Sequence, residues 1–128
     1  MLTNVNDLTG VIIGAAIEVH RSLGPGLLES AYHQCLAREL EIHGVPFKFK
    51  SPLPLEYKGL RLRKGYEIDL LVAESVIVEV KSVLAIAPIH EAQLLTYMRL
   101  RQVRVGLLMN FNEIVLKNGI RRKIIDLD

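Results

Sequence analysis

Three ionisable residues stand inside two otherwise apolar segments near the middle of the chain. Asp69 interrupts IDLLV at 68–72, and Glu79 and Lys81 interrupt VIVEVK at 76–81. Because successive side chains of a β-strand point to opposite faces, Glu79 and Lys81 point the same way. Carboxylate oxygens select Mg²⁺ or Mn²⁺ over zinc, and a lysine beside them can help to activate a water or neutralise developing charge. The pattern predicts a metal site, and in a phosphodiester cleavage such a metal would polarise the phosphate. The competing interpretation is an ion-pair ladder on an exposed sheet face.

The turn between the two segments decides whether the acids meet, because a one-residue slip in register reverses every side chain. A two-residue turn would split the apolar residues between the two faces. A three-residue loop at 73–75 keeps them on one face, made of Ile68, Leu70, Val72, Val76, Val78 and Val80. This second register sets Asp69 opposite Glu79 and Glu67 opposite Lys81, so we expect two carboxylates to converge beside one amine.

Two helices are predicted before these strands. The first is capped by Asn6 or Asp7, runs to about Ser22 and turns an apolar stripe inward: Leu8, Val11, Ile12, Ala15 and Val19. Gly24-Pro25-Gly26 ends it, and the second helix runs from about Leu27 to His43. Its inward residues are Leu28, Tyr32, Cys35, Leu36 and Leu40.

The remaining segments alternate between strand and helix patterns. Residues 45–57 are apolar at odd positions and carry three prolines, which predicts an edge strand, and a short strand follows at 60–63. A helix over 89–101 presents a polar stripe of His90, Gln93 and Tyr97. Residues 105–109 are apolar on both faces, which favours a buried parallel strand reached by a helical crossover. The last segments, 113–117 and 120–127, flank Asn118-Gly119 and predict a hairpin.

Length and composition set the outer limits. A chain of 128 residues, half of them apolar, fits one domain spanning residues 1–128. The net charge of +2 neither requires nor excludes a polyanionic partner. A single cysteine, Cys35, excludes an internal disulfide and suits a reducing compartment. No secretory pattern or membrane span is found in the sequence, so we expect a soluble, cytoplasmic protein.

The run GLLESAY at 26–32 carries the GxxExxY signature and resembles the GxxExxY proteins, a group within the PD-(D/E)XK nuclease superfamily. The resemblance covers nearly the whole chain and includes IEVHRSLGPGLLE at 17–29, IDLLV at 68–72, VEVKS at 78–82, HEAQLLTYM at 90–98 and GLLMNF at 106–111. It implies an α/β, restriction-endonuclease-like fold in which helices flank a mixed β-sheet. It also implies a Mg²⁺- or Mn²⁺-dependent phosphodiesterase acting on nucleic acid, with DNA favoured over RNA.

The resemblance assigns a role to each candidate residue. Asp69 matches the first strand acid, and Glu79 and Lys81 match the ExK pair. Glu29 matches a helical acid that supports the metal, which gives Asp69, Glu79 and Glu29 as metal ligands. Gln93 and Tyr97 match the polar face of the following helix, where they would orient phosphate or lysine. Independently of any function, the helix dipole favours a carboxylate at Glu29, in a first turn.

One position departs from the family pattern. Glu67 stands where a basic residue usually precedes the strand acid. It could hold Lys81 in its charged form, add a third acid to the site, or mark a site no longer tuned for cleavage. The alternative function is therefore a catalytically inactive nucleic-acid-binding or assembly module, forming a homo-oligomer through an edge strand.

Overall fold

The structure is a computed structural model that describes residues 4–127, apart from the side chains of Arg63 and Lys64. Its elements, in chain order, are α1 (Val5–Leu23), α2 (Glu29–Ile42), β1 (Phe47–Tyr57), β2 (Leu60–Val72), β3 (Val76–Lys81), α3 (Pro88–Arg101), β4 (Val105–Asn110), the 3₁₀ helix η1 (Leu116–Gly119) and β5 (Ile120–Ile124). The five strands form one sheet in the order β1-β2-β3-β4-β5. Only β3 and β4 are parallel, which confirms the predicted mixed sheet.

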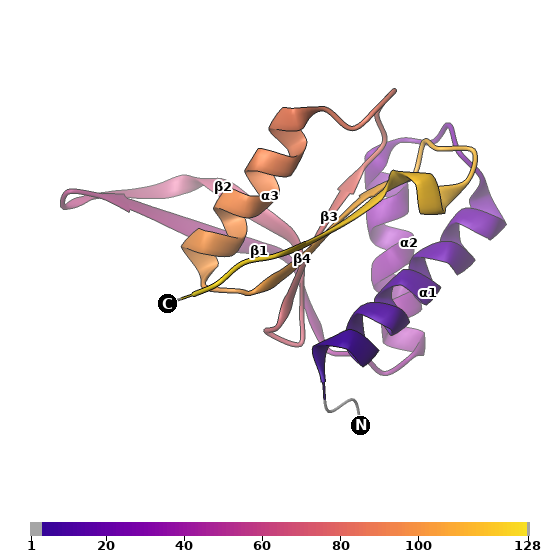
Figure 1. The fold of residues 1–128 in the computed structure, drawn as a ribbon, viewed down its shortest axis with the longest axis horizontal. Helices are drawn as coiled ribbons and strands as arrows, with labels where there is room; N and C mark the ends of the chain where they lie inside the picture. Colours follow the sequence, from indigo (N-terminus) through magenta and orange to yellow (C-terminus); the bar gives the residue numbers. More distant parts are fainter. Residues whose placement is uncertain (1–3, 128) are drawn as a thin grey trace.

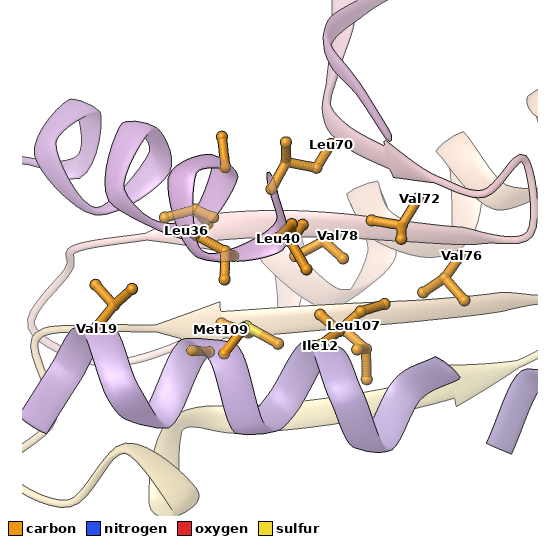
Figure 2. Close-up of a cluster of buried hydrophobic side chains, with 14 of the residues drawn as sticks. Ile12, Val19, Leu36, Leu40, Leu70, Val72, Val76, Val78, Leu107 and Met109 are labelled. Atoms are coloured by element: carbon orange, nitrogen blue, oxygen red, sulfur yellow. The ribbon is translucent and has the colours of Figure 1, made fainter. Parts of the chain in front are cut away.

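Helices cover both faces of this sheet (Figure 1). On one face, α1 and α2 pack against alternate residues of β2, β3 and β4 (Figure 2). The fully buried members of this core include Ile12, Leu36, Leu40, Leu70, Val78 and Leu107. On the other face, α3 contributes Leu94, Tyr97 and Met98 to a second core with Leu71, Ile77 and Leu108. The face predicted to be mixed is therefore also largely covered, by α3.

Both N-terminal helices start differently from prediction. The cap of α1 is Asn4, whose Oδ1 accepts a hydrogen bond of 2.9 Å from the backbone N–H of Asp7, so the prediction of Asn6 or Asp7 as the cap was wrong. The helix α2 begins at Glu29, and Leu28 is 78% exposed, although it was predicted to face inward. Leu28 is the cap residue that precedes the helix, and its backbone is extended, so helical periodicity does not apply to it.

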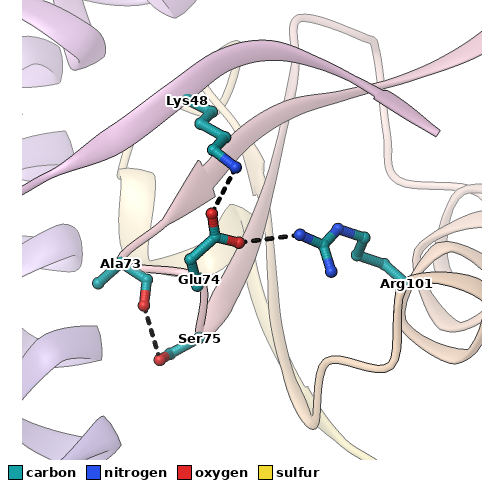
Figure 3. A network of polar contacts seen from close by, with 5 residues as sticks. All are labelled: Lys48, Ala73, Glu74, Ser75 and Arg101. Atoms are coloured by element: carbon teal, nitrogen blue, oxygen red, sulfur yellow. Dashed lines mark hydrogen bonds and ion pairs between the residues drawn. The ribbon is translucent and has the colours of Figure 1, made fainter.

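The loop between β2 and β3 has the predicted three residues, Ala73 to Ser75. Val72 pairs with Val76, which confirms the register. Ala73 and Glu74 adopt left-handed backbone with φ of 50° and 56°. Glu74 is held from two sides, at 2.5 Å from Lys48 Nζ and 2.9 Å from Arg101 Nη2 (Figure 3). These ion pairs tie the turn to β1 and to the end of α3.

Beyond this regular part the strands β2 and β3 separate. The predicted register would continue with Ile68 opposite Val80 and Glu67 opposite Lys81. Neither pair forms, because the ladder ends at the pair of Leu70 with Val78. Glu67 instead pairs with Pro52 of β1 and is exposed. Ile68 packs in the α3 core, with Leu71. The strict alternation of faces therefore breaks at residue 69. There the side chains of Asp69 and Glu79 lie in the gap between β2 and β3.

The other strands confirm some predictions and correct others. β1 is an edge strand, and β4 is fully buried and parallel to β3, both as predicted. The short strand at 60–63 is the beginning of a continuous β2. The predicted tail hairpin was wrong, because β5 pairs antiparallel with β4 and residues 116–119 form η1. Within residues 4–127, no helix combines the length and apolar character needed to cross a bilayer.

Candidate active site

Asp69 and Glu79 lie together where β2 and β3 separate. The backbone N–H of Asp69 donates to Glu79 Oε2 at 2.8 Å, and the backbone N–H of Val80 donates to Asp69 Oδ2 at 2.8 Å. Each carboxylate thus accepts a hydrogen bond that a backbone carbonyl would accept if the ladder between β2 and β3 continued. The two reciprocal bonds fix both side chains in the gap, which confirms that the acids converge.

The donor set fits a hard divalent cation. One oxygen of each carboxylate accepts a backbone hydrogen bond, while Asp69 Oδ1 and Glu79 Oε1 accept none from the described part of the chain. Among the residues described, no three His, Cys, Asp or Glu side chains are grouped closely enough to hold a metal. Mg²⁺ is commonly held by only one or two carboxylates, with water and substrate phosphate completing the shell. Asp69 and Glu79 together meet that requirement.

Glu79 is the most strongly perturbed acid of this site. It is 4% exposed, and burial, followed by the charge of Asp69, raises its pKa to about 8. The hydrogen bond from Asp69 and the charge of Lys81 oppose that rise in pKa. A buried carboxyl beside a second acid is a poor member of a surface ion-pair ladder. Neither acid forms an ion pair with Lys81 among the described side chains, so the ladder interpretation was wrong.

Lys81 reaches the helix α3 instead. Its Nζ donates to Gln93 Oε1 at 3.4 Å, and Gln93 Nε2 donates to the Tyr97 hydroxyl at 3.2 Å. Burial, then the charges of Glu79 and Asp69, raise the pKa of Tyr97, which keeps its hydroxyl protonated. Gln93 and Tyr97 of the predicted polar stripe therefore lie toward the strand acids and Lys81, whereas His90 Nδ1 accepts a hydrogen bond from Ala87 N at the start of α3. A chain of two hydrogen bonds thus links the Lys81 amine to Gln93 and Tyr97.

Glu29 lies outside the direct contacts of the two strand acids. It is exposed at the start of α2, and its charge is the weakest of the resolved influences on the pKa of Glu79. The loop before it is fixed, because the buried Tyr32 hydroxyl donates to Gly24 O at 2.6 Å and accepts from Leu27 N at 3.0 Å. Ser82, just after β3, donates to Leu27 O at 2.6 Å. These bonds hold the beginning of α2 beside the end of β3.

Two supporting residues were missed by sequence reasoning. His33 of α2 is 5% exposed, stacks on Phe49 with ring centroids 4.1 Å apart, and places Nε2 at 2.7 Å from Asp69 O. The fully buried Asn110, at the end of β4, donates to Val83 O and accepts from Val83 N, both at 3.0 Å. It secures the segment that leads from Lys81 to α3. A histidine at one helical position and an asparagine at a strand end carry no sequence signal that names their partners.

One hollow lined by described residues lies away from the candidate site. It has a volume of about 550 Å³ and is lined by the start of α1, the 73–75 loop and residues 102–105, together with Arg122 and Ile124. None of the predicted site residues borders it. The candidate site is defined by its converging acids and amine rather than by this hollow.

Comparison with known proteins adds the family. Neither the curated proteins nor the solved structures gave a significant match. A family model described as the PD-(D/E)XK nuclease superfamily matches residues 6–123. This range contains the strand acids, the lysine, α2, α3 and all of α1 except Val5. The mixed sheet flanked by helices is consistent with the restriction-endonuclease-like fold of that superfamily. The chain belongs to the PD-(D/E)XK nuclease superfamily.

Proposed function

We propose that this protein is a Mg²⁺- or Mn²⁺-dependent phosphodiesterase that cleaves nucleic acid, with DNA favoured over RNA. The observation that carries the proposal is the pair of acids at the divergence of β2 and β3. A buried glutamate with a pKa of about 8 lies beside a second carboxylate, and each retains one oxygen that accepts no hydrogen bond from the described residues. A divalent cation relieves the repulsion between such acids.

Each residue of the site has a role that follows from its position. Asp69 and Glu79 present the ligand oxygens, and a divalent cation held there would polarise the scissile phosphate and lower the pKa of a bound water. Lys81 neutralises the charge that develops on the phosphate or assists the nucleophilic water. Gln93 and Tyr97 keep the amine directed at the same space. Glu29 supports the site through water, because it is exposed at the start of α2 rather than grouped with the two acids.

We also assign the chain to the GxxExxY group within the superfamily. The assignment rests on Gly26, Glu29 and Tyr32. Gly26 has φ of 98°, which favours glycine, and the Tyr32 hydroxyl anchors the loop that precedes Glu29. Gly26 and Tyr32 thus shape the loop that leads to Glu29.

Two measurements test the proposal. Isothermal titration of Mg²⁺ or Mn²⁺ should give binding by the wild-type protein and no binding by Asp69→Ala or Glu79→Ala. Glu41→Gln is the control, since it removes an exposed acid of α2. Labelled duplex DNA, single-stranded DNA and RNA should then be cleaved only with metal, and duplex or single-stranded DNA faster than RNA. A wild-type protein that binds neither ion would refute the enzymatic function.

A non-catalytic module is the second candidate, and one observation favours it. Glu67, where the family pattern has a basic residue, is exposed on β2 and pairs with Pro52 rather than approaching Lys81. Metal binding without cleavage of any of the three substrates would favour this candidate. Cleavage that is abolished by Glu79→Ala would exclude it.

A further inference from the structure

The outer part of the β1–β2 hairpin, residues 54–65, has no established role and is here called the hairpin arm. Figure 1 shows it extending beyond the helices on either side of the sheet. Its strands pair Leu55 with Leu62 and Tyr57 with Leu60, after a register shift between Leu53 and Leu55. The arm is therefore a two-stranded ribbon, and most of its described side chains are exposed to solvent rather than packed within the fold.

The arm carries more net charge than the whole protein. Four of its twelve residues are basic and one is acidic, which gives +3, compared with +2 for the entire chain. The basic side chains of the arm that the structure describes, Lys58 and Arg61, are exposed to solvent. Arg61 has a side chain that is 70% exposed and lies 3.6 Å from the exposed Glu56, and Lys58 lies 5.3 Å from the centroid of the Tyr57 ring. Exposed ion pairs of this kind bind weakly, so Arg61 stays free to exchange partners.

The arm continues the strand that carries the first catalytic acid. From Asp69 to the tip at Leu60 the chain has nine steps of β-strand, which span about 30 Å. Duplex DNA rises about 3.4 Å per base pair, so the tip lies about nine base pairs, close to one helical turn, from the acids. The major groove is about 12 Å wide and admits a two-stranded ribbon.

We propose that the hairpin arm enters the major groove of duplex DNA about one turn from the active site and binds the phosphates of the DNA. The proposal rests on the proposed function and names the form of its substrate. Lys58 and Arg61 contact phosphates at the groove edge, and Tyr57, which is 64% exposed, lies against the groove. The arm positions the duplex without taking part in the chemistry.

A second copy of the chain is the other occupant to consider. Tyr57, Leu60 and Leu62 form an exposed apolar strip on one face of the arm. Two arms meeting face to face would bring together two charges of +3, which repel. Charge therefore favours a polyanion.

The test measures binding of labelled duplex DNA by fluorescence anisotropy in EDTA, where no metal-dependent cleavage can occur. The arm variant is Lys58→Asn with Arg61→Gln, because Lys58 has φ of 47° and asparagine tolerates that backbone. The control is Arg38→Gln with Lys117→Gln, which removes the same charge from exposed positions on α2 and η1. Thermal unfolding of both variants verifies the fold.

We expect the arm variant to bind about tenfold more weakly or worse, and the slope of log affinity against log salt to fall by about 2. The control should stay within about twofold of wild type. Equal weakening of both variants would overturn the proposal, since only net charge would then matter. So would a wild-type dimer in sedimentation velocity that Tyr57→Ser with Leu60→Ser dissociates while DNA binding is unchanged.

Failure of the arm proposal and failure of the proposed enzymatic function give different results. Arm-dependent binding without cleavage under any metal would refute the enzyme and support the arm. Metal-dependent cleavage by a protein whose arm variant binds DNA like wild type would support the enzyme and refute the arm.

Discussion

Replacing Glu79 by glutamine should change how stability depends on pH. Burial and the adjacent Asp69 raise the pKa of Glu79 to about 8, from an ordinary value of 4.5. Between these values the folded protein holds a proton on Glu79 that the unfolded chain has released. Because the folded state binds more protons, the free energy of unfolding falls as pH rises. The stabilisation is complete below about pH 4.5 and is lost as pH passes through about 8.

The size of the effect follows from the width of that window. A single group changes the free energy of unfolding by at most about 1.4 kcal/mol per pH unit. For Glu79 the loss between pH 5 and pH 8 is about 3 kcal/mol. Glutamine keeps an acceptor for the Asp69 N–H but does not ionise. The Glu79→Gln variant should therefore lack this component and become more stable than wild type at high pH.

Urea denaturation of both proteins from pH 5 to pH 9, in EDTA, measures the difference. Titrating groups distant from Glu79 cancel when the two curves are subtracted. Added Mg²⁺ should restore stability to the wild type at pH 8 and have little effect on Glu79→Gln, because metal and proton compete for the same oxygen. Identical pH slopes for the two proteins would refute the reasoning, since Glu79 would then be ionised in the folded protein without metal.

Three further substitutions test other parts of the structure. A side chain at Gly106 would meet Met98 Sδ at 2.6 Å, so Gly106→Ala should lower the free energy of unfolding by about 1–3 kcal/mol in urea denaturation; an unchanged midpoint would contradict this packing. His33→Phe keeps an aromatic ring but removes the bond to Asp69 O, and should cost about 1–2 kcal/mol and weaken Mn²⁺ binding by calorimetry, whereas wild-type affinity would deny His33 a positioning role. Lys81→Met should leave Mn²⁺ binding in place and slow cleavage at least about 100-fold, and a wild-type rate would remove the lysine from the mechanism.

Local patterns were sufficient for much of the site. The register of β2 against β3 follows from keeping the apolar residues on one face, and the pair of Val72 with Val76 confirms it. The parallel position of β4 follows from apolar residues on both of its faces. The polar stripe of α3 follows from helical spacing, and it brings Gln93 to Lys81 as predicted.

Features that depend on distant partners could not be predicted in this way. The separation of β2 from β3 at Asp69 uses His33 from α2, which lies 36 positions earlier. The alternation that placed Ile68 with Leu70 takes no account of such a break. The Asn118-Gly119 signal failed for a related reason. A Cβ at Gly119 would lie 2.6 Å from Asn110 O, so this glycine allows close packing against the end of β4 instead of a hairpin turn.

The proposed function requires Asp69 and Glu79 to hold one divalent cation between the diverging strands. Anomalous diffraction from crystals soaked in Mn²⁺ tests it most directly, with Glu79→Gln crystals as the control. We expect one strong peak at about 2.0–2.4 Å from an oxygen of each carboxylate, and no such peak in the variant. Wild-type crystals with no peak between these two side chains, or with Mn²⁺ bound only elsewhere, would contradict it.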